Sequence, residues 1–385
     1  MKRLMQTLTR TALAAALGFG LTATALAADL KVGLSVSLSG PNSSLGVPYA
    51  KGMQAALAYR PEVNGRKIQL IVLDDGSDPT TAGRNARKLV EEDKVDVLMG
   101  TSGVPAAIAM AQVGRDAKVP MIGLTPIQLD AAENPWVFTV AQPTQLLIDA
   151  VVQRMKKDGV KSVGYIGFSD AWGDLVYNAL MKSAPEAGIQ VLGNERYARA
   201  DASVTGQVLK LLAMKPDAVM TGGAGTPGAL PFLALTERGF KGPVYGQHGL
   251  INPDFVRVVG ASGQNALMPT GPVIVAEQLP DGYPTKKIAM DFRAAFQKVN
   301  NAPTSDAFSA YSFDGWLVFT DAAARAKGEP GTPEFRLSLR DAIASTKEVV
   351  GTHGVYNFKP GNLYGVDERA RVIVKLDNGQ WKLAP

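Results

Sequence analysis

The sequence predicts an α/β protein built from two doubly wound, mostly parallel sheets. Short apolar runs alternate with amphipathic helical stretches, which is the pattern of parallel strands covered by helices on both faces. Two stretches begin alike, near Leu30 and near Val160, each with a strand, a loop of small residues and a helix. Because no long Ser/Gly linker separates them, discontinuous lobes joined by short crossovers are expected rather than two domains in tandem.

Each element follows from its local pattern. Continuous apolar runs predict strands at Lys31–Ser37, Lys67–Leu73, Val95–Met99, Val119–Ile122, Ser162–Ile166, Ala218–Thr221 and Pro243–Tyr245. Helical periodicity predicts helices at Val47–Tyr59, Thr80–Asp93, Ala106–Ala117, Thr144–Lys157, Trp172–Ser183, Ser203–Met214 and Pro227–Arg238. In such sheets ligands bind beyond the carboxyl ends of the strands, so the loops after each strand are the places to search for a site.

The first 27 residues have the pattern of a cleavable signal peptide. Lys2, Arg3 and Arg10 flank an uncharged apolar stretch at Thr11–Leu21, and Ala25-Leu26-Ala27 is a small-x-small cleavage site. The apolar stretch is too short to stay as a membrane span. We therefore expect an exported chain that starts near Ala28 and resides in the periplasm.

Composition excludes several classes of function. Without the predicted leader about 358 residues remain, more than one hydrophobic core usually organises. The formal charge of +5 loses three cations with the leader, and no basic cluster suited to nucleic acid or anionic lipid is present. Cysteine is absent and only two histidines occur, which excludes disulfides, thiol catalysis, a lipoprotein anchor and a His-rich metal site.

In the first half, two loops after strands offer hydroxyl and backbone groups. Gly100–Pro105 places Ser102 where a helix N-cap belongs, and the start of a helix binds anions such as carboxylates. The other interpretation is an ordinary Ser cap after a Gly turn. Gly123–Ile127 presents Thr125 toward the same cleft. The acidic turn Asp74–Asp78 lacks the order of a calcium loop, so we interpret it as a solvated turn with Asp78-Pro79 capping the next helix.

In the second half, three loops that follow predicted strands are candidate ligand contacts. Trp172 lies beside a Gly at a strand-to-helix turn and could stack on a ligand or simply cover a local core. The small residues of Thr221–Thr226 let the backbone approach a ligand closely. Gly223, Gly225 and Gly228 have the GxGxxG spacing of dinucleotide-binding loops, but no acidic residue follows on a suitable strand, so the match is weak as a nucleotide-binding motif. His248 follows the last predicted strand, where a ligand contact and a structural role are both open.

Enzyme motifs fail. Gly100-Thr101-Ser102 begins like a nucleophile elbow, but Val104 stands where the last Gly is required. Because no complete enzyme motif is found, we expect a protein that is not an enzyme. A secreted hydrolase that uses Ser102 and His248 stays open as a remote alternative.

Taken in order, these segments resemble the periplasmic solute-binding proteins of ABC importers, of the leucine/isoleucine/valine-binding type. The resemblance covers essentially all of the chain after the leader. The segments that carry it are Lys31-Val32-Gly33, Leu38–Pro41, Gly46, Gly52–Ala58, Leu73–Asp75, Asp78-Pro79, Val97–Gly100, Ser102, Val119–Ile122, Trp172–Asp174, Gly222-Gly223 and Phe313–Gly315.

The resemblance implies two lobes that close over one ligand around a three-segment hinge, as in type I periplasmic binding proteins. Residues 28–141 and 272–356 would form one lobe, and residues 142–271 and 357–385 the other. It implies a small-molecule carboxylate ligand, an inner-membrane ABC permease as partner, no cofactor, no metal, no nucleic acid and no direct membrane insertion. A periplasmic sensor subunit is the alternative with the same fold.

The resemblance also implies the ligand-binding residues. These are Leu45, Thr101, Ser102, Leu124, Thr125, Pro126, Trp172, Gly225, Thr226 and His248. Ser102 matches the carboxylate-binding Ser of the family and Trp172 an aromatic of the second lobe. The small residues after Gly223 stand where the family has another aromatic, which implies a roomier pocket.

His248 departs from the family, whose amino-acid-binding members place a carboxylate there for the ligand's ammonium group. A neutral imidazole cannot balance that charge, and an unpaired buried ammonium is costly. We therefore expect a carboxylate ligand without an α-amino group, an aromatic acid of the benzoate kind or a small aliphatic acid. The alternative is a branched-chain amino acid, with Asp170 meeting the ammonium.

Overall fold

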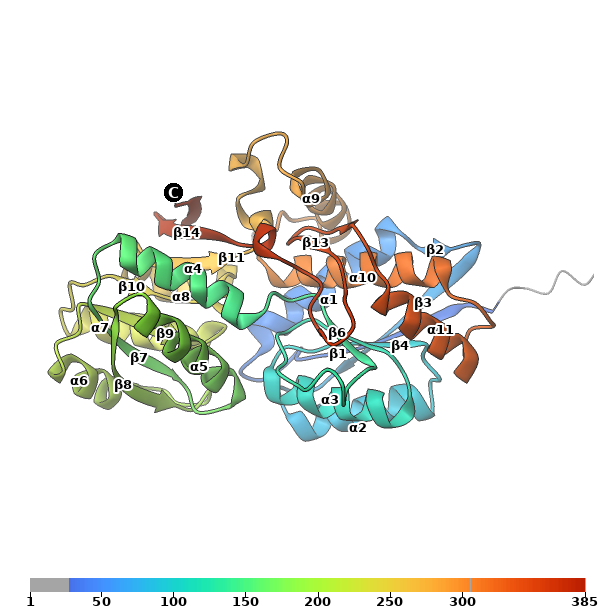
Figure 1. Ribbon diagram of the computed structural model, residues 1–385, viewed down its shortest axis with the longest axis horizontal. Coiled ribbons are helices and arrows are strands. Elements are labelled where there is room, and N and C mark those ends of the chain that lie inside the picture. The colour runs from blue at the N-terminus through green and yellow to red at the C-terminus, as the bar shows by residue number, and fades with distance from the viewer. Residues whose placement is uncertain (1–27, 305, 385) are drawn as a thin grey trace, which may run out of the picture.

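The computed structural model describes residues 28–304 and 306–384, so the predicted leader lies outside the described residues. The chain forms two α/β lobes that lie side by side (Figure 1). We call the lobe around the six-stranded sheet the first lobe and the lobe around the seven-stranded sheet the second lobe. The predicted fold class, two lobes with mostly parallel sheets, is confirmed.

The sheet of the first lobe has the strand order β2-β3-β1-β4-β5-β6. All neighbours are parallel except β2, which pairs with β3 in antiparallel fashion. The strands are β1 (Leu30–Val36), β2 (Glu62–Val63), β3 (Arg66–Asp74), β4 (Val97–Gly100), β5 (Met121–Gly123) and β6 (Val137–Thr139). The buried faces of β1 and β4 are almost wholly apolar, as strands covered on both sides require.

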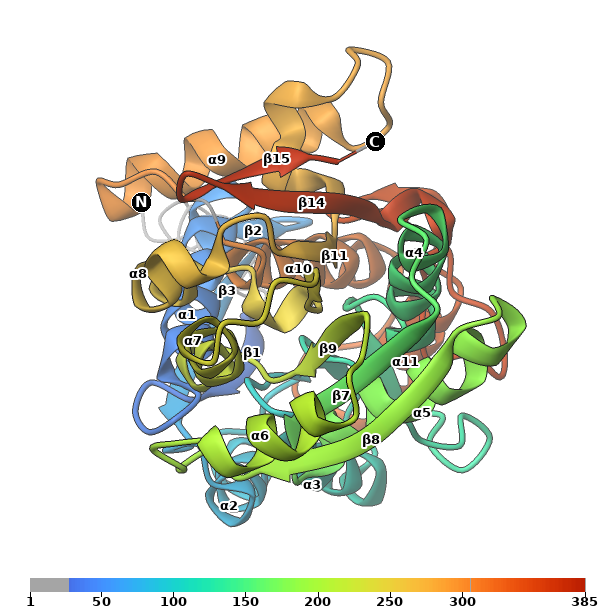
Figure 2. The same ribbon diagram turned by 90° about the vertical axis from the view of Figure 1, so that its left-hand side faces the viewer.

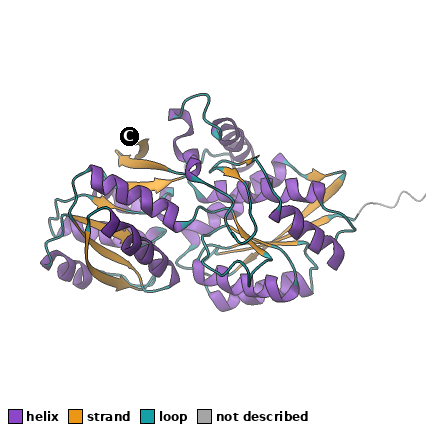
Figure 3. Ribbon diagram, in the orientation of Figure 1, coloured by secondary structure: helices purple, strands orange, loops and turns teal. Residues whose placement is uncertain are grey.

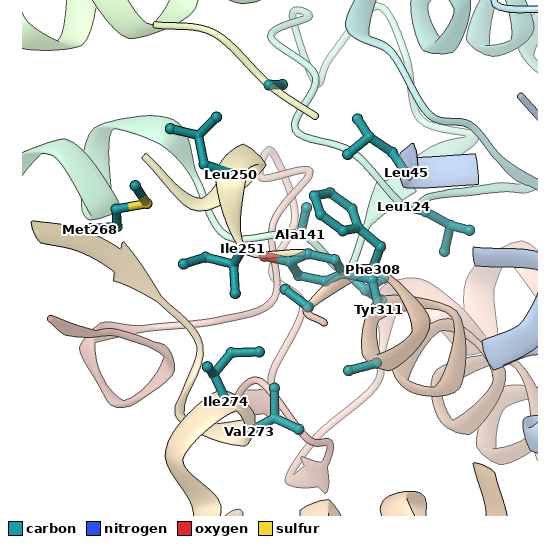
Figure 4. Packing of buried hydrophobic residues seen from close by; sticks show 14 of the residues in the cluster. Leu45, Leu124, Ala141, Leu250, Ile251, Met268, Val273, Ile274, Phe308 and Tyr311 are labelled. Carbon is teal, nitrogen blue, oxygen red and sulfur yellow. The ribbon is translucent and has the colours of Figure 1, made fainter. Parts of the chain in front are cut away.

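Helices cover both faces of this sheet (Figure 3). One face packs on α2 and α3 through an apolar cluster that includes Leu89, Leu98, Met110 and Met121. The other packs on α1 and α10 through a larger cluster that continues into the second lobe, where Leu250 and Met268 belong to it (Figure 4). The helices are α1 (Ser43–Tyr59), α2 (Pro79–Glu91), α3 (Val104–Ala117), α9 (Lys286–Asn300), α10 (Phe308–Arg325) and α11 (Pro333–Ala344).

The sheet of the second lobe has the order β15-β14-β11-β10-β9-β7-β8, parallel from β11 to β8 and antiparallel at the β14–β15 edge (Figure 2). Its strands are β7 (Ser162–Phe168), β8 (Gln190–Tyr197), β9 (Ala218–Gly222), β10 (Val244–Tyr245), β11 (Leu267–Thr270), β14 (Val372–Asp377) and β15 (Gln380–Leu383). A separate two-stranded ribbon joins β12 (Val349–Val350) to β13 (Val355–Tyr356).

Five α-helices surround that sheet among the described residues. They are α4 (Thr144–Lys157), α5 (Ala171–Glu186), α6 (Thr205–Ala213), α7 (Leu230–Glu237) and α8 (Pro253–Val259). Short 3₁₀ turns complete the loops: η1 (Thr226–Ala229), η2 (His248–Leu250), η3 (Gly260–Gly263), η4 (Pro272–Gln278) and η5 (Glu368–Ala370). None of the helices in the described ranges is both long and apolar enough to cross a membrane.

The chain passes between the two sheets three times, after β6, after β11 and before β14. The three crossovers meet at a buried point. Gln142 on the first donates from Nε2 to the carbonyl of Ala370 on the third at 2.9 Å. Gly271 on the second lies so close that a Cβ there would come within 1.9 Å of Nδ1 of His353. We call Gln142, Gly271 and His353 the hinge cluster; the residue boundaries of the lobes stay a prediction.

Every predicted helix and strand is present in the described residues, and α4 has the bounds expected from its periodicity. Asp78 caps α2 as predicted, accepting from the N–H of Thr81 at 2.7 Å. The interpretation of Asp74–Asp78 as a solvated turn is wrong for Asp75, which is fully buried. Its carboxylate accepts from the hydroxyl of Ser37 at 2.6 Å and from the N–H of Ser77 at 2.9 Å, and thus ties the β1–α1 loop to the β3–α2 loop.

Candidate functional site

A small cavity of ≈ 20 Å³ lies between the lobes, where the carboxyl ends of both sheets face each other. The loops after β4, β5, β7, β8, β9 and β10 contribute to it, together with α1 and the start of α10. This is the position that parallel α/β sheets use for ligands. Its lining residues are Leu45, Tyr49, Ser102, Gly103, Val104, Thr125, Trp172, Arg199, Ala224, His248, Gly249 and Phe308.

Ser102 is positioned on the first lobe by a backbone contact. Its Oγ accepts from the N–H of Ser37 at 2.9 Å, which leaves its own hydroxyl hydrogen for another acceptor. The prediction that Ser102 caps the following helix is wrong, because the N-cap of α3 is Gly103, which has no side chain to bond the first N–H groups. Those N–H groups therefore keep their capacity to bind an anion.

Thr125 and Tyr49 continue the first-lobe wall. The backbone carbonyl of Thr125 accepts from Oγ1 of Thr139 at 3.2 Å, which fixes the loop after β5. Tyr49, on α1, donates from its hydroxyl to the carbonyl of Leu124 at 2.7 Å and packs edge to face on Phe308, with ring centroids 5.4 Å apart. The wall thus combines hydroxyl groups with two aromatic rings.

Trp172 lies in the first turn of α5 on the second lobe. Oδ1 of Asp170 caps that helix and accepts from the N–H groups of Trp172 at 3.0 Å and Gly173 at 3.3 Å. The indole meets the imidazole of His248 edge to face, with centroids 5.4 Å apart and planes at 90°. The ring is 3% exposed, so it is buried and also lines the cavity.

His248 begins the turn η2, which Gln247 positions. The Oε1 of Gln247 accepts from the N–H of Gly249 at 2.5 Å, and its amide also donates to the carbonyl of Gly223. The imidazole contacts the rings of Trp172 and Tyr311, yet neither of its nitrogens has a hydrogen-bond partner among the described residues. Burial lowers the pKa of His248 to about 3, so the ring is neutral at physiological pH.

Arg199, which was not predicted, brings a positive charge to the cavity from the loop after β8. Its Nε donates to Oδ2 of Asp170 at 2.6 Å, and its guanidinium carbon lies 4.1 Å from the ring centroid of Phe168. Its Nη1 donates across the cleft to Oδ1 of Asn42 at 2.9 Å. Asp170 is therefore engaged by a helix cap and by Arg199, and it is not among the lining residues.

The structure brings together Leu45, Ser102, Thr125, Trp172 and His248 from the predicted set. The other predicted residues lie outside the lining. Thr101 is fully buried and donates to Asp75. Leu124 and Pro126 are buried behind the wall.

Gly225 and Thr226 lie against α1 and are not among the residues that line the cavity. The N–H of Thr226 donates to Oγ of Ser44 at 3.1 Å, and a Cβ on Gly225 would lie 2.7 Å from that same oxygen. These contacts join the lobes, and they leave Ala224 and Gly249 as the small residues of the cavity wall.

The site residues that sequence reasoning missed come mainly from helices and from one unexpected loop. Tyr49 and Phe308 lie on α1 and α10, whereas the search considered only loops after strands. Arg199 follows β8, a strand with a largely half-exposed pattern that gives no apolar run. No signal in the sequence marks Arg199, but Tyr49 could have been found as the large apolar residue one turn after Leu45.

The chemistry of the lining is that of a neutral to positive, aromatic cavity. Among the lining residues there is one cation, Arg199, and no carboxylate. Nor is there, in the described part of the chain, any group of three or more His, Asp or Glu side chains that could hold a metal ion. Such a cavity can bind an anion and pack a ring, but it offers no acid to a cationic group.

These features are typical of two-lobed ligand-binding proteins, and they make the cavity between the lobes the candidate site. The family model described as "Periplasmic binding protein" matches residues 29–361, and the chain belongs to that family. The chain is 23% identical over 315 residues to the "Leu/Ile/Val-binding protein homolog 7" of Brucella suis, covering 75% of both chains. This is a family of solute-binding proteins and not of enzymes.

The chain is also similar to solved structures of ligand-binding proteins. The chain is 39% identical to an extracellular ligand-binding receptor from Rhodopseudomonas palustris, with a TM-score of 0.89 over 93% of this chain and 100% of that one. An ABC-transporter solute-binding protein of R. palustris, in complex with benzoate, has a TM-score of 0.76 at 21% identity, over 92% of this chain and 95% of that one. At that identity the second likeness concerns the fold.

Proposed function

We propose that this protein is the periplasmic substrate-binding component of an ABC importer and that it captures a small carboxylate that carries no α-amino group. An aromatic acid is the ligand class that we favour. The lobes close over the ligand, and an inner-membrane permease receives it from the closed form. The signal-like pattern of residues 1–27 and the family support export and transport.

One observation carries the choice of ligand: the cavity lining holds Arg199 and a neutral His248 but no carboxylate. A ligand ammonium buried there would lack a counter-charge, which costs several kcal/mol. A carboxylate would instead meet the hydroxyl of Ser102 and the uncapped start of α3. The rings of Tyr49, Trp172 and Phe308 favour an aromatic body, because aromatic pairs gain about 0.5–1.5 kcal/mol beyond burial.

His248 would bind a second polar group of the ligand. A buried imidazole without a hydrogen-bond partner is unfavourable, and a ligand hydroxyl or carbonyl would supply one. 4-Hydroxybenzoate should therefore bind more tightly than benzoate. The benzoate complex of the R. palustris relative supports the view that this fold can hold an aromatic acid.

A branched-chain amino acid is the second candidate, favoured by the names of the Brucella relatives. It would need Asp170 for the ammonium, but both oxygens of Asp170 are engaged, one by the cap of α5 and the other by Arg199. The binding of such a ligand would require that ion pair to open.

A thermal-shift screen separates the two candidates. The panel contains benzoate, 4-hydroxybenzoate, leucine, isoleucine and valine. A ligand at one hundred times its Kd stabilises the folded state by about 2.7 kcal/mol, which is a clear shift of Tm. We expect shifts with the aromatic acids and none with the amino acids. Shifts with the amino acids only would contradict the proposal, and labelling of Ser102 by a serine-directed phosphonate would indicate a hydrolase instead.

A further inference from the structure

Arg199 is the charged side chain of the cavity whose role the proposed function leaves open. It is held from the second lobe on two sides, by the carboxylate of Asp170 and by the face of Phe168. Asp170 itself receives two backbone N–H groups at the start of α5, which offset part of its charge. The guanidinium is thus held in place at the cavity wall by an ion pair and by a ring.

The same guanidinium reaches the first lobe at Asn42. The backbone N–H of Asn42 donates to Oγ of Ser77 at 3.0 Å, so this residue is anchored to its own lobe. Its side-chain amide spans the gap between Arg199 and the start of α3: Oδ1 accepts from Arg199, and Nδ2 lies 3.0 Å from the place of a Cβ on Gly103. Arg199 therefore comes next to the anion-binding end of the first-lobe wall.

Arg199 also has donors to spare. A guanidinium carries five N–H donors in a planar fork that suits a carboxylate. The described residues accept from Nε and from Nη1 only, and Nη2 has no acceptor among them. The side chain lines the cavity, so a ligand there can supply a further acceptor.

We propose that Arg199 binds the ligand carboxylate from the second lobe while Ser102 and the start of α3 bind it from the first. One carboxylate then bridges the lobes, and Arg199 determines the preference for an anion. This inference rests on the proposed function in that the ligand is an anion. It goes further by naming the group of the second lobe that recognises the charge.

The test pairs a charged ligand with its neutral counterpart. Calorimetric Kd values for benzoate and benzamide are measured on the unaltered protein, on Arg199→Gln and on Arg257→Gln. The last is a matched loss of charge on an exposed helix of the same lobe. We expect Arg199→Gln to weaken benzoate about 10- to 100-fold, the range of a hydrogen bond to a charged group, and benzamide less than about 3-fold. Arg257→Gln should change neither.

Two further variants keep the inference falsifiable. Arg199→Lys retains the charge without the fork and should give an intermediate loss, with unfolding curves confirming that the variants are folded. Asn42→Ala removes the acceptor across the cleft and should weaken both ligands alike. If Arg199→Gln also weakens benzoate and benzamide equally, Arg199 joins the lobes without touching the carboxylate, and the inference is overturned.

Failure of the proposed function gives a different result. If the unaltered protein binds leucine and not benzoate, the proposed ligand class is wrong. The same comparison of variants, with leucine and leucinamide as the two ligands, then decides whether Arg199 contacts a carboxylate. If none of these ligands binds to the unaltered protein, the proposed function falls, and the role of Arg199 falls with it.

Discussion

The two histidines of the chain are both buried and both contact Tyr311, but they differ in their hydrogen-bond partners. His248 lines the cavity, and its nitrogens have no hydrogen-bond partner in the described residues. His353 lies in the hinge cluster, where its Nε2 bonds the carbonyl of Ala307 at 3.0 Å and its ring stacks on Tyr311 at 3.8 Å. Burial lowers both pKa values to about 3. The two histidines therefore differ in their hydrogen-bond partners and not in their burial.

In the hinge region, a buried carboxylate has its hydrogen-bond donors within the protein. Asp314 accepts from the N–H groups of Thr352 at 2.6 Å and His353 at 2.9 Å and from the hydroxyl of Tyr356 at 2.7 Å. Every one of these bonds is internal to the fold. In the cavity, the hydroxyl hydrogen of Ser102 and Nη2 of Arg199 have no acceptor among the described residues. These donors are why we propose that a ligand binds in the cavity.

The largest effect is expected from His353→Ala. The change removes a fully buried ring, its stack on Tyr311 and a hydrogen bond at the meeting point of the crossovers. Truncation of buried rings costs about 3–5 kcal/mol. Urea unfolding of the ligand-free protein measures this loss of stability. A cost under about 1 kcal/mol would show that the hinge cluster does not need its histidine.

His248→Ala provides the matched contrast. Because the imidazole makes no hydrogen bond within the described residues, we expect the ligand-free protein to lose less stability than His353→Ala loses in the same urea experiment. We expect 4-hydroxybenzoate to lose about 10-fold in affinity and its advantage over benzoate to vanish. A stability loss as large as that of His353→Ala would erase the distinction between the two histidines.

The pH dependence of stability gives a smaller effect with a definite sign. Both histidines have a folded-state pKa of about 3 and an unfolded-state pKa near 6.5, so between these values the unfolded state binds more protons. Their contribution is complete above pH 6.5 and is lost as the pH falls toward 3. Asp314 opposes this between about pH 4 and 6, because burial raises its pKa to about 6.

We therefore expect the free energy of unfolding to fall by roughly 1 kcal/mol for each pH unit below 6. Urea titrations at several pH values measure this slope. In His248→Ala the difference in bound protons between the unfolded and folded states should fall by about one, so the free energy of unfolding should depend less on pH. An identical slope in that variant would mean that the imidazole titrates normally in the folded protein.

The sequence was sufficient for the alternation of strands and helices, because parallel strands and amphipathic helices leave strong periodic patterns. It was sufficient for Ser102 and Trp172, since both follow apolar strands. It missed the β14–β15 hairpin, although Asn378-Gly379, both with positive φ, is a turn signal of such hairpins. Arg199 could not be found, because its meaning depends on Asp170 and Asn42, which only the folded chain brings to it.

The central claim is that the cavity binds an acid without an α-amino group. The most direct measurement is a calorimetric titration with two pairs that differ only in that group, 4-methylpentanoate against leucine and phenylacetate against phenylglycine. Because a buried ammonium would lack a counter-charge, we predict that each amino-free acid binds at least about 100-fold more tightly than its partner. Tighter binding of leucine than of 4-methylpentanoate would contradict the account.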